Sequence, residues 1–235
     1  NFVIAKNLKS VSSQLFYNSC LQLAFMPEVE NIADEAFYNS HLTVICFLKV
    51  KSAGDHAFQC CRNVIQVFLP ICEKLGEYCF WDCEKVKILN LPLVKTFWKT
   101  FGDGRQFGLC YSLTDLIIPQ AEKIGKCCFI DCNLLESVNS KLDTTQFKCN
   151  VCEHEKDDKK CVICRGKLGE CLKKGNDPQN RLRIYAELEQ QKQLLIQEVT
   201  ILEHVKTLKM GVDVTIKEKD GQIQDKLLTQ QQNDK

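Results

Sequence analysis

An internal repeat is the feature that most narrows the folds open to this chain. A shift of 49 residues aligns the block from Pro70 to Cys83 with the block from Pro119 to Cys132. A shift of 43 residues aligns the stretch from Pro27 to Ser40 with the first block, although this copy lacks the cysteine pair. The shared pattern reads P-x-x-E-x-[LI]-x-x-x-[CA]-F-x-[DN]-[CS]. Repeats of this length fit a supersecondary unit that stacks on its neighbours to bury a common core.

The spacing of apolar residues within a copy predicts helices. These residues lie three or four positions apart and are Phe58, Cys61, Ile65, Phe68, Cys72, Leu75, Cys79 and Cys83. Such spacing places them on one face of a helix, and Pro70 and Pro119 are expected to kink or interrupt it. The sequence therefore predicts an all-α fold, a disulfide-stapled bundle of helical hairpins.

Three regions are expected along the chain. A helical bundle of three degenerate repeats (about 11–50, 51–100 and 101–147) fills 1–147, a cysteine-rich knuckle fills 148–175, and a helical hairpin tail fills 176–235. The tail is predicted to begin with Asp177 as N-cap and Pro178 as first helical residue. Its heptad-like seam resembles a coiled coil and covers the bundle, forms a groove that binds a partner, or forms a dimer.

The cysteine content decides the expected compartment. The chain has 16 cysteines, and all are candidates for structural disulfides. They are Cys20, Cys46, Cys60, Cys61, Cys72, Cys79, Cys83, Cys110, Cys127, Cys128, Cys132, Cys149, Cys152, Cys161, Cys164 and Cys171. Thiols at this density are typical of disulfides in an oxidising compartment, so the chain is predicted to be secreted.

A zinc site is the alternative for part of this set. The spacing of Cys149, Cys152, Cys161 and Cys164 suits four tetrahedral ligands. The chain would then be an intracellular adaptor with a zinc knuckle and a coiled coil.

Charge and motifs exclude several classes of function. With 31 Lys+Arg against 30 Asp+Glu, the net charge of +1 gives no attraction to nucleic acid. No apolar run approaches the roughly 20 residues that span a bilayer. Phosphate-loop, dinucleotide, nucleophile-elbow and zinc-protease motifs are absent from the sequence, so no enzyme activity and no cofactor are expected. An apolar ligand pocket lined by Phe58, Phe68, Trp81 and Trp98 remains an alternative.

Two families share features with this sequence. The repeated blocks Pro70 to Cys83 and Pro119 to Cys132, together with the tail from Arg181, resemble the secreted mosquito salivary 34 kDa family. That resemblance implies a non-enzymatic extracellular protein that binds a host or vector protein during blood feeding. The paired C-x-x-C motifs are also similar to the hinge of the sperm–egg fusion family, although that family continues into strands and this chain is predicted to continue into helices.

The leading hypothesis is therefore a secreted binding protein with a protein partner of unknown identity. Its alternatives are the zinc-knuckle adaptor, a carrier of an apolar small ligand and a helical ectodomain of the gamete-fusion type.

Overall fold

Residues 1–97, 105–122, 124, 128–142, 168–190, 193, 197 and 200 are described in the computed structural model of the chain. The chain divides into two compact units, Asn1–Glu187 and Leu188–Lys235. The first unit contains all of the described strands and the helix Leu168–Asn176.

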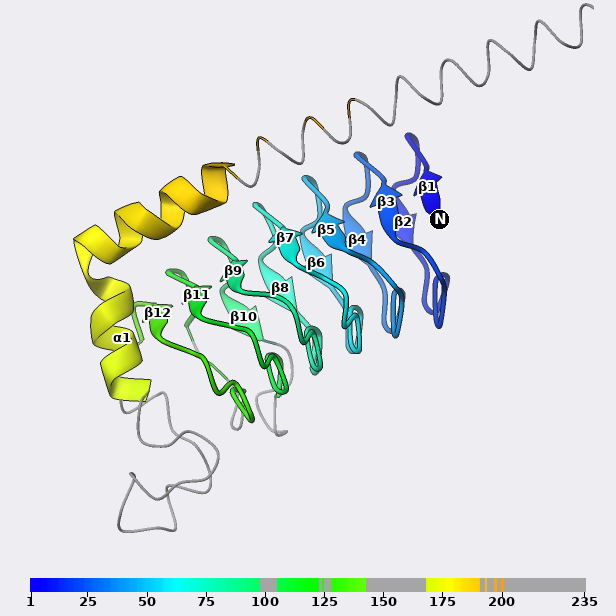
Figure 1. Cartoon of the computed structure of the whole chain (residues 1–235). Helices are drawn as coiled ribbons and strands as arrows, with labels where there is room; N and C mark the ends of the chain where they lie inside the picture. The colour runs from blue at the N-terminus through cyan, green and yellow to red at the C-terminus, as the bar shows by residue number, and fades with distance from the viewer. Residues whose placement is uncertain are drawn as a thin grey trace, which may run out of the picture. The chain divides into compact units, whose positions relative to one another are not determined.

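The first unit is a solenoid, in which successive coils stack side by side through parallel strands (Figure 1). One row holds three-residue strands: β1 (Phe2–Ile4), β3 (Leu23–Phe25), β5 (Val44–Cys46), β7 (Gln66–Phe68), β9 (Ile88–Asn90), β11 (Asp115–Ile117) and β12 (Ser137–Asn139). A second row holds two-residue strands: β2 (Ser10–Val11), β4 (Asn31–Ile32), β6 (Ser52–Ala53), β8 (Lys74–Leu75) and β10 (Thr96–Phe97). A corner joins the two strands of a coil, and a longer turn leads to the next coil.

The predicted all-α bundle is wrong, because the repeats are β-coils. Helix among the described residues is confined to α1 (Leu168–Asn176) and to positions from 178 onward. A chain that bends at every corner points a side chain inward about every third residue, which imitates helical spacing. Cys61, Val64 and Val67 are buried in this way, whereas Ile65, which the helical stripe had placed inside, is 51% exposed.

The prolines also act differently from the helix-breaking role expected of them. Pro70 is the second residue of a corner turn, closed by the Cys72 amide donating to the Leu69 carbonyl at 3.3 Å. Pro119 occupies the same place in the turn from Ile118 to Ala121, where the donor–acceptor distance is 3.1 Å. Proline suits this second position because its fixed φ matches the turn.

The true repeat is one coil, about half the length found from the sequence. The strand starts Leu23, Val44 and Gln66 occupy equivalent positions in consecutive coils, so the 43-residue shift spans two coils. Charge explains why alternate coils match best. Glu30 and Glu73 lie at one corner position, and Lys51 stands at that position in the coil between them.

A column of phenylalanine rings fills the core. The rings are those of Phe16, Phe37, Phe58, Phe80, Phe107 and Phe129. Consecutive ring centroids are 5.1, 5.5, 5.6, 6.4 and 5.9 Å apart, with interplanar angles of 11 to 16°. Each coil therefore packs on the next through an aromatic stack, which adds to the free energy gained from burial.

One glycine is required by the close approach of neighbouring coils. A Cβ at Gly76 would lie 2.3 Å from the amide nitrogen of Asp55 and 2.3 Å from the carbonyl carbon of Gly54. Because both are backbone atoms, a side chain at Gly76 would push two coils apart.

Helix α1 covers the edge strand β12. Asn176 receives hydrogen bonds on its Oδ1 from the Asn139 side chain (3.0 Å) and the Ser140 amide (3.2 Å), and its Nδ2 donates to the Ser140 carbonyl (3.0 Å). A Cβ at Gly175 would lie 2.2 Å from the carbonyl carbon of Val138, so the helix backbone rests directly on the strand. The side chains of α1 thus satisfy backbone groups that an open sheet edge would expose.

The helix start expected after α1 is confirmed. Residues 178–190 are helical, and Asp177 caps them through the Asn180 amide, which donates to Asp177 Oδ2 at 2.9 Å. The coiled-coil tail expected beyond this point lies mostly outside the described residues.

Candidate functional site

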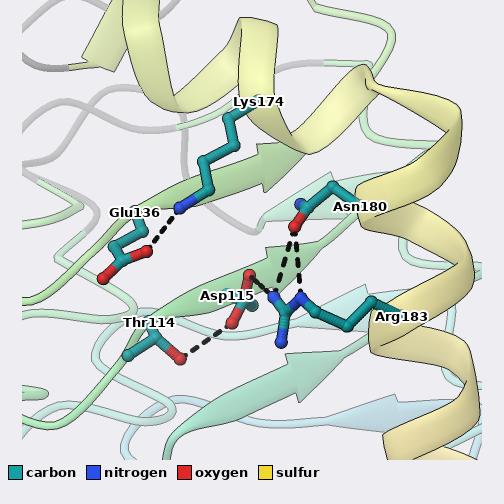
Figure 2. Close-up of a pocket in the computed structure, with 6 residues that line it drawn as sticks. All are labelled: Thr114, Asp115, Glu136, Lys174, Asn180 and Arg183. Carbon is teal, nitrogen blue, oxygen red and sulfur yellow. Dashed lines mark hydrogen bonds and ion pairs between the residues drawn. The ribbon is translucent and has the colours of Figure 1, made fainter.

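A polar pocket lies where the residues after α1 cross the last coils, and we refer to it as the cap pocket (Figure 2). Its volume is about 270 Å³. The residues that line it are Thr114, Asp115, Glu136, Lys174, Asn180 and Arg183. The first three belong to the coils, and the last three belong to the helical segments that cover them.

Asp115 is the unusual residue of the cap pocket. It begins β11 at the position where β5 has Val44 and β9 has Ile88, yet it is a carboxylate and only 4% exposed. Arg183 Nη2 lies 3.2 Å from Asp115 Oδ1, and the Thr114 hydroxyl donates to Oδ2 at 2.8 Å. Ser137 Oγ also donates to Oδ1. The buried charge is thereby paired and hydrogen-bonded, as burial of a carboxylate requires.

The other charges of the cap pocket also neutralise one another. Lys174 forms an ion pair with Glu136, and Asn180 Oδ1 accepts hydrogen bonds from Arg183 Nε (3.4 Å) and Nη2 (3.3 Å). The Lys174–Glu136 and Arg183–Asp115 pairs join helix to coil, and Asn180 orients Arg183 within the helix, so the arrangement serves first to fasten the helical segment to the solenoid. Within the described ranges no group of His, Cys, Asp and Glu side chains could hold a metal ion.

A second candidate site lies on the long turns that follow the two-residue strands. We call it the aromatic edge, and it comprises Tyr17, Tyr38, His56, Tyr78, Trp81 and Arg105. Tyr17 stacks on Tyr38 with centroids 4.8 Å apart, and His56 stacks on Tyr78 at 5.0 Å. All of these side chains keep part of their surface in solvent, and Tyr17 is 40% exposed.

Trp81 contacts both Tyr78 and Arg105 of the aromatic edge. Its ring meets Tyr78 edge-on at 5.4 Å, and the Arg105 guanidinium lies over it, 5.9 Å from the ring centroid. A Cβ at Gly108 would lie 2.2 Å from Trp81 Cζ3, so the glycine of the next coil makes the room that the indole occupies. The ring is therefore fixed in one place before any partner arrives.

The cysteines give the structure a hydrogen-bonded column. Cys61, Cys83, Cys110 and Cys132 follow the stacked phenylalanines by three residues, the place that Ser40 holds in an earlier coil. Their thiols donate to backbone carbonyls of the preceding coil: Phe37 (3.1 Å), Phe58 (3.4 Å), Phe80 (3.2 Å) and Phe107 (2.9 Å). A small apolar side chain with a weak donor satisfies those carbonyls inside the core.

Burial alters the acidity of these thiols. Removal from water, partly offset by a hydrogen bond with Ser40, raises the pKa of Cys61 to about 12. Burial likewise raises the pKa of Cys72 to about 11 and that of Cys46 to about 11. Such thiols stay protonated at neutral pH and are poor nucleophiles.

None of the predicted disulfides is formed between cysteines that the structure describes. Eleven cysteines are present as thiols: Cys20, Cys46, Cys60, Cys61, Cys72, Cys79, Cys83, Cys110, Cys128, Cys132 and Cys171. Cys127 and the alternative zinc ligands Cys149, Cys152, Cys161 and Cys164 lie outside the described residues. Oxidation of the cysteines in the native protein stays a prediction, and its test follows below.

The three described residues of the apolar pocket considered from the sequence belong to different parts of the solenoid. Phe58 is fully buried in the phenylalanine column, Phe68 lies in β7, and Trp81 belongs to the aromatic edge. Trp98 lies outside the described residues.

Sequence reasoning missed both candidate sites. Aligning single coils would have found Asp115, because an acidic residue then stands at the strand position that Val44, Gln66, Ile88 and Ser137 hold in other coils. The same alignment would have pointed to the aromatic edge, because it places Tyr17 and Tyr38 at the same position of consecutive coils. The described part of the chain contains no helix with the length and apolar character needed to cross a membrane.

Comparison with known proteins agrees with the solenoid. The family model "BspA type leucine rich repeat region" matches residues 1–100 and 103–154, in 6 copies. No curated protein matches the chain.

Two solved structures are similar to parts of it. One is a leucine rich cell surface protein from Faecalibacterium prausnitzii A2-165 (22% identity, 57% of this chain and 43% of that one, TM-score 0.43). The other is a leucine rich repeat protein from T. pallidum (21% identity, 56% and 51%, TM-score 0.38). The chain spans about half the length of these two proteins.

The family match corrects the resemblance to salivary and gamete-fusion proteins, whose helical bundles have no counterpart among the coils that the structure describes. Because the matched repeats cover more than half of the sequence, this chain belongs to the BspA-type leucine-rich repeat family.

Proposed function

We propose that this leucine-rich repeat solenoid is a non-enzymatic binding module that recognises a protein partner through its aromatic edge. The observation that carries the proposal is the group of part-exposed Tyr, Trp and Arg side chains held in fixed positions along consecutive turns. These residue types dominate the binding energy of protein interfaces.

Stacking favours this surface in a second way. The rings of His56 and Tyr78 already restrict each other, so a partner that packs on them orders few new rotamers. The cap pocket is the weaker candidate, because its charged groups are paired with one another and would have to be separated to bind a ligand.

The experiment compares proteins captured by the full chain and by two matched variants. Tyr38→Ala combined with Trp81→Ala removes two of the four Tyr and Trp rings of the aromatic edge, and Ile65→Ala removes an exposed apolar side chain elsewhere. Binding is quantified by mass spectrometry of the captured proteins and then by interferometry with the purified candidate. Circular dichroism and thermal melting establish that each variant is folded.

The proposal expects one partner whose affinity falls at least about tenfold in the aromatic-edge variant and stays unchanged in the Ile65 variant. Equal capture by all three proteins would refute it.

An extracellular or cell-surface location is part of the same proposal and rests on the cysteine content. Intact mass before and after reduction and alkylation tests it. A difference matching eight bridges among the 16 cysteines would support this location. Sixteen thiols alkylated in urea without reduction would place the chain in a reducing compartment.

A further inference from the structure

The corners between the three-residue and two-residue strands carry a row of alternating charge. Its members, coil by coil, are Lys9, Glu30, Lys51, Glu73, Lys95 and Glu122. The amide of each donates to the carbonyl of the one before it, at 2.9, 2.8, 2.9, 3.0 and 3.0 Å, so the row is continuous along the solenoid. In Figure 1 these corners lie at the edge opposite the long turns that carry the aromatic edge.

Alternation leaves the row with no net charge. Lys51 is paired with Glu30 at 2.8 Å and Lys95 with Glu73 at 3.8 Å, and the side chains of these pairs are 39 to 62% exposed. Such exposed pairs contribute little to stability. A row without net charge attracts neither a polyanion nor a polycation. A partner must therefore carry charges that alternate in the complementary order.

Apolar side chains accompany the charges at the same corners. Leu48, Ile71 and Leu93 come from consecutive coils and are 55, 36 and 40% exposed. Leu48 shares its corner position with Pro70, Pro92 and Pro119 of the following coils, and Ile71 shares the next position with Leu93. One exposed leucine needs no explanation, but a stripe across several coils is typical of a contact surface. We call the charged row and this stripe together the corner ridge.

We infer that the corner ridge is the surface through which two copies of this chain associate, antiparallel, around a two-fold axis. An alternating row is complementary to its own reverse, which is the condition for an isologous interface. When the two-fold axis passes between the coils of Glu73 and Lys95, Glu73 of each copy faces Lys95 of the other. Lys51 then faces Glu122 of the second copy.

The apolar stripe selects this register over its neighbour. With the same axis, Ile71 faces Leu93 of the second copy, and Leu48 faces Pro119. Moving the axis by one coil, between Lys51 and Glu73, keeps the charges opposite but places Leu93 against Glu28. A parallel arrangement in register would place like charges against each other, which destabilises an interface.

The dimer is expected to be weak. Strand spacing of about 4.8 Å makes the four coils from Lys51 to Glu122 span about 14 Å, so the buried area falls in the range of transient complexes. A dissociation constant of the order of 10 to 100 μM follows.

Sedimentation of the full chain over a wide concentration range tests the association, and charge exchange tests the surface. Lys51→Glu with Lys95→Glu gives an acidic ridge, and Glu73→Lys with Glu122→Lys gives a basic one. Each variant alone is expected to dimerise at least about tenfold more weakly than the parent. An equimolar mixture of the two is expected to form a heterodimer at least as tight as the parent dimer.

Two further variants locate the contact. Ile71→Ser is expected to weaken the dimer by about tenfold, whereas Ile65→Ser, which changes a more exposed isoleucine outside the ridge, is expected to leave it unchanged. Thermal melting of each variant reports that the solenoid is intact.

Three results would overturn the inference: a parent protein that stays monomeric at several hundred micromolar, charge variants that dimerise like the parent, or a mixture that fails to recover association. The second result would place any dimer contact in another part of the chain, such as the tail. Loss of partner binding at the aromatic edge would leave these outcomes unaffected, because the two surfaces share no residue.

Discussion

Replacing Phe58 by alanine should destabilise the solenoid more than the same change at Phe16, the first ring of the phenylalanine column. The Phe58 ring is fully buried and stacks on Phe37 at 5.5 Å and on Phe80 at 5.6 Å. Removing a buried phenylalanine costs about 3–5 kcal/mol, and its two ring stacks account for about 1–3 kcal/mol of that. With a urea m-value of about 2 kcal/mol/M, the unfolding midpoint should fall by about 2 M.

Phe16→Ala is the matched control, because that ring is only partly buried and among the described residues stacks on Phe37 alone. Its expected cost is about 1–2 kcal/mol. Urea unfolding of the full chain, followed by far-ultraviolet circular dichroism, compares the two variants. Equal shifts of the midpoint would refute the view that stacking between coils, rather than local burial, holds the column together.

Three further predictions follow from single contacts. Gly175→Ala should lift α1 from β12 and increase amide exchange in Val138 and Asn139, whereas Lys173→Ala on the same helix should not; unchanged exchange would contradict the close contact. Hydrogen bonds from Lys49 and Lys9 lower the pKa of Glu28 to about 2, so its stabilising effect is present above the unfolded value near 4.5 and is lost as pH falls toward 2. Melting temperatures of the parent and Glu28→Gln should therefore converge on acidification, and a constant difference would contradict this. Alkylation at pH 8 should modify the exposed Cys20 in the folded protein, and Cys61, whose pKa is about 12, only after unfolding. If Cys61 can be alkylated in urea only after a reductant is added, it forms a disulfide as the sequence predicted.

Part of this architecture was accessible from the sequence. The blocks containing Pro70 and Pro119 identified a repeat, and Asp177 identified a helix start, because turn residues and caps act through neighbours in the sequence. The cysteine spacing from Cys79 to Cys83 was misleading, because inward positions of a bent coil recur at nearly helical intervals. Both residues are buried, but they lie on a turn.

The period of the repeat was harder to find for an electrostatic reason. Because Lys51 stands between Glu30 and Glu73, alternate coils have more similar sequences than neighbouring coils. Aligning the sequence with itself therefore finds a repeat that is two coils long. Only single-coil alignment reveals that Asp115 is an acidic residue at the strand position that Ile88 and Ser137 hold in the neighbouring coils, and no local pattern links it to Arg183, 68 positions later. The cap pocket therefore depends on tertiary contacts that a search for motifs does not detect.

The direction of the hydrogen bonds between coils has a mechanical consequence. In β5, β7 and β9 these bonds run along the stack rather than across it, as parallel pairing requires. Tension applied between the ends of the stack would act on every junction between coils in series and open the junctions in succession, whereas tension along a strand would load many bonds of one junction in parallel. Each released coil would free about 70 Å of chain, so the solenoid should lengthen in steps under a small force and act as an extensible tether.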